Sequence, residues 1–269
     1  MKKQKNIQTQ SNLHFINLVN NKKATKTEFA GRYKIDTGIE KKILKNIIKN
    51  LKLQTGKKNN LSLLDIGCGC GILTEYLIKY CTSTKIYLTL LDIKDVIKIL
   101  KKNYKNFKSN IKLINAEFHK HNFKKKKFDR ILLYSVIQYT DNPLFFLKKA
   151  FKLVKKQGLI FIGDIPNINK KFRFLNSQFG TKFEIQYQKK FKKINMTSIL
   201  KKEEIRKKYN ITTFRKFYNN TKQNKNINDK FILDVIKYFR NKNANVYVFA
   251  QPKIFPFYFT REDILIEKI

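Results

Sequence analysis

Five residues that could hold a nucleoside stand close together in the sequence. Gly67, Gly69 and Gly71 are spaced as G-x-G-x-G, and Asp65 precedes the first of them by two residues. Glycine lets the backbone turn sharply and approach a ligand closely, because it has no Cβ. A further acid, Asp92, follows 21 positions after Gly71, where its carboxylate could accept hydrogen bonds from both hydroxyls of a ribose. The pattern indicates a site for a nucleoside-containing ligand.

These residues need a strand, a loop and a helix to position them. Residues 61–66 form a short apolar run typical of a buried parallel strand, and helical spacing resumes at residue 72. Two simpler readings remain open: the glycines could form an ordinary tight turn, and Asp92 could cap the helix predicted at 93–100. Further strands are predicted at 85–92, 112–115, 130–135, 158–164, 245–250 and 261–267, and further helices at 38–53, 142–154 and 226–241.

The glycine loop resembles the first motif of the class I S-adenosylmethionine-dependent methyltransferases, which reads hydrophobic-hydrophobic-(Asp/Glu)-x-Gly-x-Gly-x-Gly. A dinucleotide-binding loop would read G-x-G-x-x-G. The resemblance covers about residues 38–165 and 226–269 and implies an α/β fold: a doubly wound, mostly parallel, seven-stranded Rossmann-like sheet with a lid insertion after the fifth strand. The loop 251–258, the final strand 261–267 and residues 163–167 resemble, more loosely, methyltransferases of bacterial surface-polysaccharide gene clusters.

The resemblance implies S-adenosylmethionine as the cofactor and suggests which residues contact it. Asp92 matches the acid that binds the ribose. Where the family commonly has Asp followed by Ala against the adenine amino group, this chain has Asn115 followed by Ala116. The carboxyl end of the fourth strand lies beside the methyl group in the family. The expected cofactor-binding residues are Asp65, Gly67, Cys68, Gly69, Gly71, Asp92, Ile93, Asn115, Ala116, Glu117, Tyr134 and Ser135.

A hydroxyl acceptor would need a base, and Asp164 is the candidate. It stands at the carboxyl end of the fifth predicted strand, on the ligand side of the sheet. Tyr139 and Gln138 are candidates for orienting the acceptor. Alternatively, Asp164 could have a structural role in capping the following turn.

The net charge is +40, from 59 basic and 19 acidic residues. This excess could serve a polyanionic partner such as RNA, or it could follow from coding bias, since Lys, Asn, Ile, Phe and Tyr are all abundant. Glu is not enriched along with them, so bias leaves part of the excess unexplained.

The three cysteines form no disulfide framework, because Cys68 and Cys70 lie inside the glycine loop and Cys81 follows the next helix. They are expected to be reduced in a cytoplasmic protein, and mildly reactive if the loop is exposed. His119 and His121 could share one face of a strand, but no third ligand is evident, so no metal is expected. No apolar run approaches 18 residues, so no integral membrane segment is expected.

The chain divides into a basic flexible arm (1–30), an N-terminal part of the methyltransferase domain (31–165), a basic aromatic lid insertion (166–225) and a C-terminal part (226–269). The aromatic residues of the lid could stack nucleic-acid bases or simply pack the lid onto the body. The expected function is methyl transfer to a small-molecule or glycan acceptor, at oxygen or nitrogen. The alternatives are an RNA methyltransferase that uses the basic lid and a non-catalytic Rossmann-like binding module.

Overall fold

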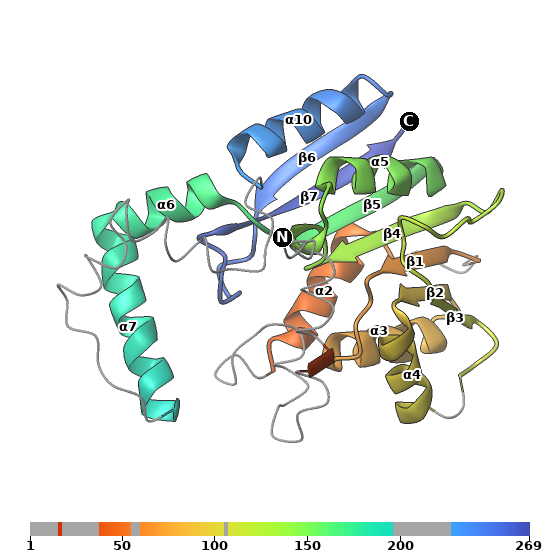
Figure 1. Ribbon diagram of the computed structural model, residues 1–269, viewed down its shortest axis with the longest axis horizontal. Coiled ribbons are helices and arrows are strands. Elements are labelled where there is room, and N and C mark those ends of the chain that lie inside the picture. Colours follow the sequence, from red (N-terminus) through yellow and green to blue (C-terminus); the bar gives the residue numbers. More distant parts are fainter. Residues whose placement is uncertain (1–15, 18–37, 55–59, 105–106, 196–226) are drawn as a thin grey trace, which may run out of the picture.

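The protein forms a single twisted sheet with helices on both faces (Figure 1). The computed structural model describes residues 16–17, 38–54, 60–104, 107–195 and 227–269; it does not describe the side chains of 187–195. The strands are β1 (Ser62–Ile66), β2 (Tyr87–Asp92), β3 (Ile111–Asn115), β4 (Phe128–Tyr134), β5 (Val154–Pro166), β6 (Ala244–Ala250) and β7 (Arg261–Lys268). The helices are α2 (Glu40–Asn50), α3 (Ile72–Ser83), α4 (Lys94–Asn103), α5 (Pro143–Leu153), α6 (Ile168–Asn176), α7 (Gln178–Asn195) and α10 (Asp229–Arg240), with a 3₁₀ turn η3 (Ile137–Tyr139).

The strand order fixes where a ligand can bind. The seven strands lie in the order β3-β2-β1-β4-β5-β7-β6, and β7 is antiparallel to both of its neighbours. The chain first runs outward from β1 to β3 and then returns to place β4 on the other side of β1. In such sheets ligands bind where the order reverses, outside the carboxyl ends of the strands. The carboxyl ends of β1 and β4 are therefore the expected floor of the site.

Alternating strand side chains build two cores, one on each face of the sheet. On one face, α2, α3 and α4 pack against β1, β2 and β4 through residues such as Ile47, Leu77 and Leu90. On the other face, α5 and α10 pack against the sheet through residues such as Leu147, Phe239 and several strand isoleucines. Because both faces are covered, the central parallel strands carry almost continuous apolar sequence.

Local sequence determines where two helices begin. The Asn142 side chain accepts a hydrogen bond of 3.0 Å from the Phe145 N–H, and Pro143 occupies the first turn of α5, as predicted. The Asn228 side chain accepts from the Phe231 N–H at 2.9 Å in the same way and starts α10. These caps bring the apolar faces of both helices onto the sheet.

The described part of the predicted lid consists of α6 and α7, which extend away from the sheet in Figure 1. Phe174 of α6 stacks on Phe259 with ring centroids 4.4 Å apart, and Phe183 of α7 meets Phe259 at 5.0 Å. These rings attach the lid to the loop between β6 and β7, so the prediction that aromatic side chains pack the lid onto the body is confirmed for them. Residues 196–225 of the predicted lid, and the predicted arm 1–30 apart from Ile16 and Asn17, lie outside the described residues.

The prediction of a doubly wound, mostly parallel seven-stranded α/β sheet is confirmed, with element boundaries that differ by a few residues. The largest difference is β5, which begins at Val154 instead of Gly158 and continues to Pro166. The domain boundaries remain predictions. Among the residues that the structure describes, no helix has the length and apolar character needed to cross a membrane.

Candidate functional site

The loop after β1 places its glycines in two different environments. Gly67 and Gly69 both have positive φ, 69° and 63°, a conformation that side chains with a Cβ rarely adopt. A Cβ on Gly67 would lie 2.8 Å from Val136, so this residue packs the β1 loop against the β4 loop. A Cβ on Gly69 would meet no described atom within 4 Å. Gly69 therefore borders open space, whereas Gly71 provides the extended backbone that starts α3.

Asp92 lies against this loop, as the nucleoside-site prediction requires. Its Oδ2 accepts a hydrogen bond of 2.8 Å from the Gly69 N–H, and its Oδ1 accepts one of 2.7 Å from the Ile93 N–H. Each carboxylate oxygen can accept more than one hydrogen bond, so both retain capacity for ligand hydroxyls. The first residue of α4 is preceded by Ile93 as the N-cap, so the alternative in which Asp92 caps this helix is wrong.

Asp65 is a buried carboxyl group that interacts electrostatically with the partly exposed Asp92. Only 5% of its surface is exposed, and no donor in the described part of the chain is bonded to it. Burial, together with the negative charge of Asp92, raises the pKa of Asp65 to about 8. Burial also raises the pKa of Asp92 to about 6, although the N–H groups of Gly69 and Ile93 act in the opposite direction. Two adjacent acids with raised pKa values are suited to a ligand that carries a positive charge.

The sign of the Asp65 shift determines how pH affects the ligand-free fold. Because its folded pKa lies above the ordinary value of 3.8, the folded state binds the proton more tightly than the unfolded state does. This contribution to stability is complete below pH 3.8 and is lost as pH rises through about 8.

The two cysteines in the glycine loop have different surroundings. Burial, followed by the negative charges of Asp92 and Asp65, raises the pKa of the Cys68 thiol well above its ordinary value. Cys68 is partly exposed and Cys70 is buried. The Thr74 hydroxyl donates a 2.5 Å hydrogen bond to the Cys68 carbonyl and fixes the loop on α3. Cys68 borders the site mainly through its backbone.

The end of β3 lies next to Asp92, where a nucleobase was predicted. Asn115 is paired in register with Asp92 and is exposed, and the Ala116 N–H donates to the Asp92 carbonyl at 3.0 Å. The carboxylate of Glu117 instead contacts Lys120 at 3.0 Å and His119 at 3.3 Å. Of the three residues, Asn115 has the side chain best suited to contact a ligand.

The end of β4 contains a strained residue held by a buried amide. Ser135 has φ 59°, and its Oγ accepts a hydrogen bond of 3.0 Å from Gln138 Nε2. Gln138 is completely buried, and its Oε1 accepts no hydrogen bond from the described residues. Tyr139, in the same 3₁₀ turn, is partly exposed. Strained residues often occur at functional sites, and the buried Gln138 holds the Ser135 side chain through this hydrogen bond.

Gly163 on β5 supports the ring of Tyr134 on β4. A Cβ at position 163 would lie 2.4 Å from Tyr134 Cδ2 and 2.5 Å from Cε2. We expect Gly163→Ala to destabilise the protein by about 1–3 kcal/mol, because the ring has to move. Denaturant unfolding measures this cost. The double variant Gly163→Ala with Tyr134→Ala should cost less than the sum of the two single changes, and strict additivity would contradict the contact.

Asp164 is held in an unusual backbone conformation at the end of β5, with φ 62°. Its N–H donates to Asp263 Oδ1 at 2.9 Å, and its carbonyl accepts from Arg261 Nη1 at 3.2 Å. Its carboxylate Oδ1 lies 3.7 Å from Arg261 Nε. The helix that follows, α6, is capped by the side chain of Asn167 and not by Asp164. The alternative of a structural role for Asp164 stays a prediction.

The sequence analysis missed Asp263 on β7. Its carboxylate is completely buried and accepts hydrogen bonds from the Asp164 N–H, from Gln251 Nε2 at 3.0 Å and from Asn46 Nδ2 at 3.2 Å. Burial raises its pKa to about 6. Asp263 thus joins α2, the end of β5 and the β6–β7 loop around Asp164. The sequence did contain a signal for it: Asp263 is a charged residue directly before the apolar residues Ile-Leu-Ile of a predicted strand. A charged side chain that faces the core needs hydrogen-bonding partners.

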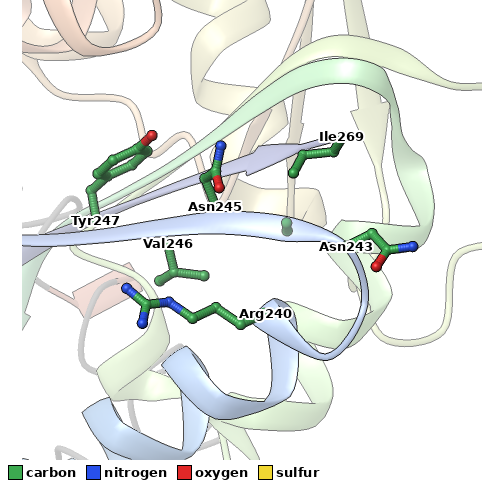
Figure 2. A pocket seen from close by; sticks show the side chains of 7 residues that line it. Arg240, Asn243, Asn245, Val246, Tyr247 and Ile269 are labelled. Atoms are coloured by element: carbon green, nitrogen blue, oxygen red, sulfur yellow. The ribbon is translucent and has the colours of Figure 1, made fainter.

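One surface pocket is unrelated to these strand ends. It has a volume of about 370 Å³ and lies beside the start of β6, where Arg240, Asn243, Asn245 and Tyr247 line it (Figure 2). The start of β6, at Ala244, pairs with the end of β7, at Lys268. The other end of β6, at Ala250, pairs with Glu262, which also pairs with Ile165, the residue after Asp164. The pocket therefore lies at the opposite end of β6 from the level of Asp164.

No group of three or more His, Cys, Asp or Glu side chains arranged for a metal ion occurs among the described residues. His119 contacts Glu117, and His121 meets Phe123 edge to face at 4.6 Å. Both histidines belong to the β3–β4 loop.

Comparisons with known proteins agree with this arrangement. Residues 64–162 match the family model described as a methyltransferase domain. Over 136 residues the chain is 35% identical to a ubiquinone biosynthesis O-methyltransferase of Pelagibacter ubique (strain HTCC1062), covering 49% of this chain and 54% of that protein. Over 129 residues it is 28% identical to a ribosomal RNA small subunit methyltransferase A of Mesomycoplasma hyopneumoniae (strain 232), covering 48% and 46%. The chain thus spans about half the length of these curated relatives.

Among solved structures, the chain resembles the plantazolicin methyltransferase BpumL in complex with SAH, with TM-score 0.55, 16% identity, and coverage of 98% of this chain and 99% of that one. It also resembles the N-methyltransferase NodS from Bradyrhizobium japonicum WM9, with TM-score 0.53, 11% identity, and coverage of 94% and 95%. At these identities the likeness concerns the fold, which is the Rossmann-like methyltransferase fold. Over residues 64–162 and in its fold, the chain resembles the class I S-adenosylmethionine-dependent methyltransferases.

Proposed function

We propose that the chain is an S-adenosylmethionine-dependent methyltransferase that acts on a small-molecule or glycan acceptor at oxygen or nitrogen. The observation that carries the proposal is the Asp92 carboxylate bonded to the Gly69 N–H beside open space at Gly69. Relatives named as O-methyltransferases support it, including a malonyl-[acyl-carrier protein] O-methyltransferase of Ilyobacter polytropus, 27% identical over 148 residues. The acceptor, the methylated atom and a cytoplasmic location are parts of this proposal.

The residues at the strand ends fit the chemical groups of the cofactor. Asp65 has a raised pKa and accepts no hydrogen bond from the described residues, which suits the ammonium group at the amino-acid end. The remaining lone pairs of Asp92 suit the ribose hydroxyls. Asn115 is exposed beside Asp92 and suits the adenine amino group. A bound cofactor would supply an already activated methyl group, so the protein needs to orient the acceptor and exclude water.

Asp164 would take the proton from a hydroxyl acceptor. Asp263 accepts a hydrogen bond from its backbone N–H, and Arg261 donates one to its carbonyl. These bonds fix the backbone from which the Asp164 side chain extends at the end of β5. Ser135 on the neighbouring strand would face the same acceptor, and its N–H donates to the Gly163 carbonyl at 2.9 Å. The buried Gln138 side chain would keep the Ser135 hydroxyl in place by donating a hydrogen bond to it.

Calorimetric titration with S-adenosylhomocysteine tests the cofactor site, and transfer of labelled methyl groups from the cofactor into fractionated small-molecule, glycan and RNA pools tests the acceptor class. Binding with label in a small-molecule or glycan fraction is the expected result. Label confined to RNA would favour the alternative of an RNA methyltransferase, which the relative named as a ribosomal RNA methyltransferase supports. Failure to bind would leave a non-catalytic module.

The pH dependence of binding tests the role assigned to Asp65. A ligand ammonium favours the ionised carboxylate, so affinity should rise from pH 6 to about 8 and then level off. At pH 7 the affinity should be about tenfold below the plateau, and binding should release close to one proton. Titrations in two buffers of different ionisation enthalpy measure that release. Asp65→Asn should abolish it, and an unchanged release would assign the proton to another group.

A further inference from the structure

Lysines gather on the edge strand β3 and on the loop that leads from β3 to the start of β4. β3 and β6 form the two edges of the sheet (Figure 1). We define the basic face as Lys112 on β3, Lys120, and the run Lys124–Lys127 that ends the β3–β4 loop. All six side chains are exposed. Burial and then the charge of Lys112 lower the pKa of Lys126. Burial, then Lys149 and then Lys112 lower the pKa of His121, so Lys112 lies near both residues. The strand and the loop therefore form one surface.

The loop that carries these lysines is fixed to the body. Phe118 and Phe123 are buried, with exposed fractions of 3% and 7%, and Phe118 packs on Phe146 with ring centroids 4.6 Å apart. Lys149 of α5 donates hydrogen bonds of 2.9 Å to the carbonyls of both His119 and His121. Because the loop is already ordered, a ligand that binds it does not have to meet the cost of ordering its backbone.

Two acidic side chains lie near the basic face. Glu117 pairs with Lys120 of the basic face at 3.0 Å and also contacts His119, whereas Asp129 accepts hydrogen bonds from the Ser62 hydroxyl at 2.6 Å and from Lys155 at 3.0 Å, outside the basic face. Lys124, Lys125 and Lys126 form no ion pair with the described residues. Their mutual repulsion would be relieved by a partner that carries several negative charges.

We propose that the basic face binds the phosphate backbone of single-stranded RNA. The apolar side chains of the loop point inward, so the surface has charge but nothing to insert into a lipid interface, where binding needs exposed apolar area. The lysines lie on a loop and an edge strand and not on a helix that could enter a DNA groove, and a flexible single strand can follow such a surface. This binding is separate from the proposed function, because RNA need not be the methyl acceptor.

The test compares two triple variants that lose the same charge. Lys124→Gln, Lys125→Gln and Lys126→Gln change the basic face, whereas Lys230→Gln, Lys237→Gln and Lys242→Gln change exposed lysines on or next to α10, by the β6 edge. Binding of a fluorescent 20-nucleotide RNA of mixed sequence is measured between 50 and 300 mM salt. The first variant should reduce the slope of log affinity against log salt by about 2, since each phosphate contact contributes about 0.7.

The α10 variant should leave this slope unchanged. Equal losses in the two variants would mean that only net charge matters and would overturn the proposal. Binding to vesicles with anionic lipid but not to RNA, or equally tight binding to duplex DNA, would overturn the choice of single-stranded RNA. Both variants should bind S-adenosylhomocysteine like the parent protein, so failure of the cofactor site and failure of the basic face are distinguishable.

Discussion

Asp92→Ala is expected to weaken binding of S-adenosylhomocysteine about 100-fold, measured by calorimetry at pH 8. Two charge-assisted hydrogen bonds to ribose hydroxyls contribute at least about 1.5 kcal/mol each, and about 3 kcal/mol corresponds to a factor of about 100. The matched control is Asp95→Ala, which removes an exposed acid from the first turn of α4, three residues further along the chain. This control should bind like the parent.

Asp92 also holds the Gly69 N–H, so part of any loss could come from movement of the loop. Asp92→Asn separates the two effects, because the amide oxygen can still accept from Gly69 but the charge is lost. An affinity restored to the parent value in Asp92→Asn would assign the role of Asp92 to the loop alone. An unchanged affinity in Asp92→Ala would remove this residue from the site.

Asp164→Asn is expected to lower kcat by a factor of about 10²–10⁴ when the acceptor is a hydroxyl, with cofactor affinity within a factor of two of the parent. A positioned base contributes about this much to a proton-transfer step. The amide retains the backbone hydrogen bonds to Asp263 and Arg261 but cannot take a proton. Rates of labelled methyl transfer and calorimetry on the same preparation measure both quantities.

Asp234→Asn provides the control for this change, because Asp234 is an exposed acid on α10. A parent-like rate in Asp164→Asn would exclude this carboxylate as the base and would favour an acceptor that loses its proton without help, such as a neutral amine. A lower cofactor affinity would instead place Asp164 in the binding of the cofactor.

The fold was predictable because its signals are local and agree with one another. Apolar runs of strand length alternate with helical periodicity, and Asn142 with Pro143 mark the start of α5 in the sequence alone. The glycine spacing predicted the β1 loop, and Asp92 at the end of β2 does meet Gly69. The carboxyl ends of neighbouring parallel strands lie at the same edge of the sheet, whatever the details of side-chain packing. These parts of the candidate site could therefore be predicted from the sequence.

What could not be predicted depends on contacts between distant segments. Asp263 meets Asp164 and Asn46 across 99 and 217 positions of sequence, and no local pattern indicates such a junction. The burial of Gln138 and the strain at Ser135 likewise follow from how β4 and β5 pack. The raised pKa of the Cys68 thiol results from burial and from the nearby acids, which the glycine spacing could not indicate.

The placement of β7 also determines the order in which the sheet can be completed. β6 precedes β7 along the chain, yet within the described sheet β7 is its one neighbour. During synthesis, β6 and the helix α10 that packs on it therefore have no strand to join until residues 261–268 have left the ribosome. The same eight residues bring Asp263 to Asp164, so a nascent chain can form the glycine loop and the β1–β5 sheet well before it can organise the end of β5.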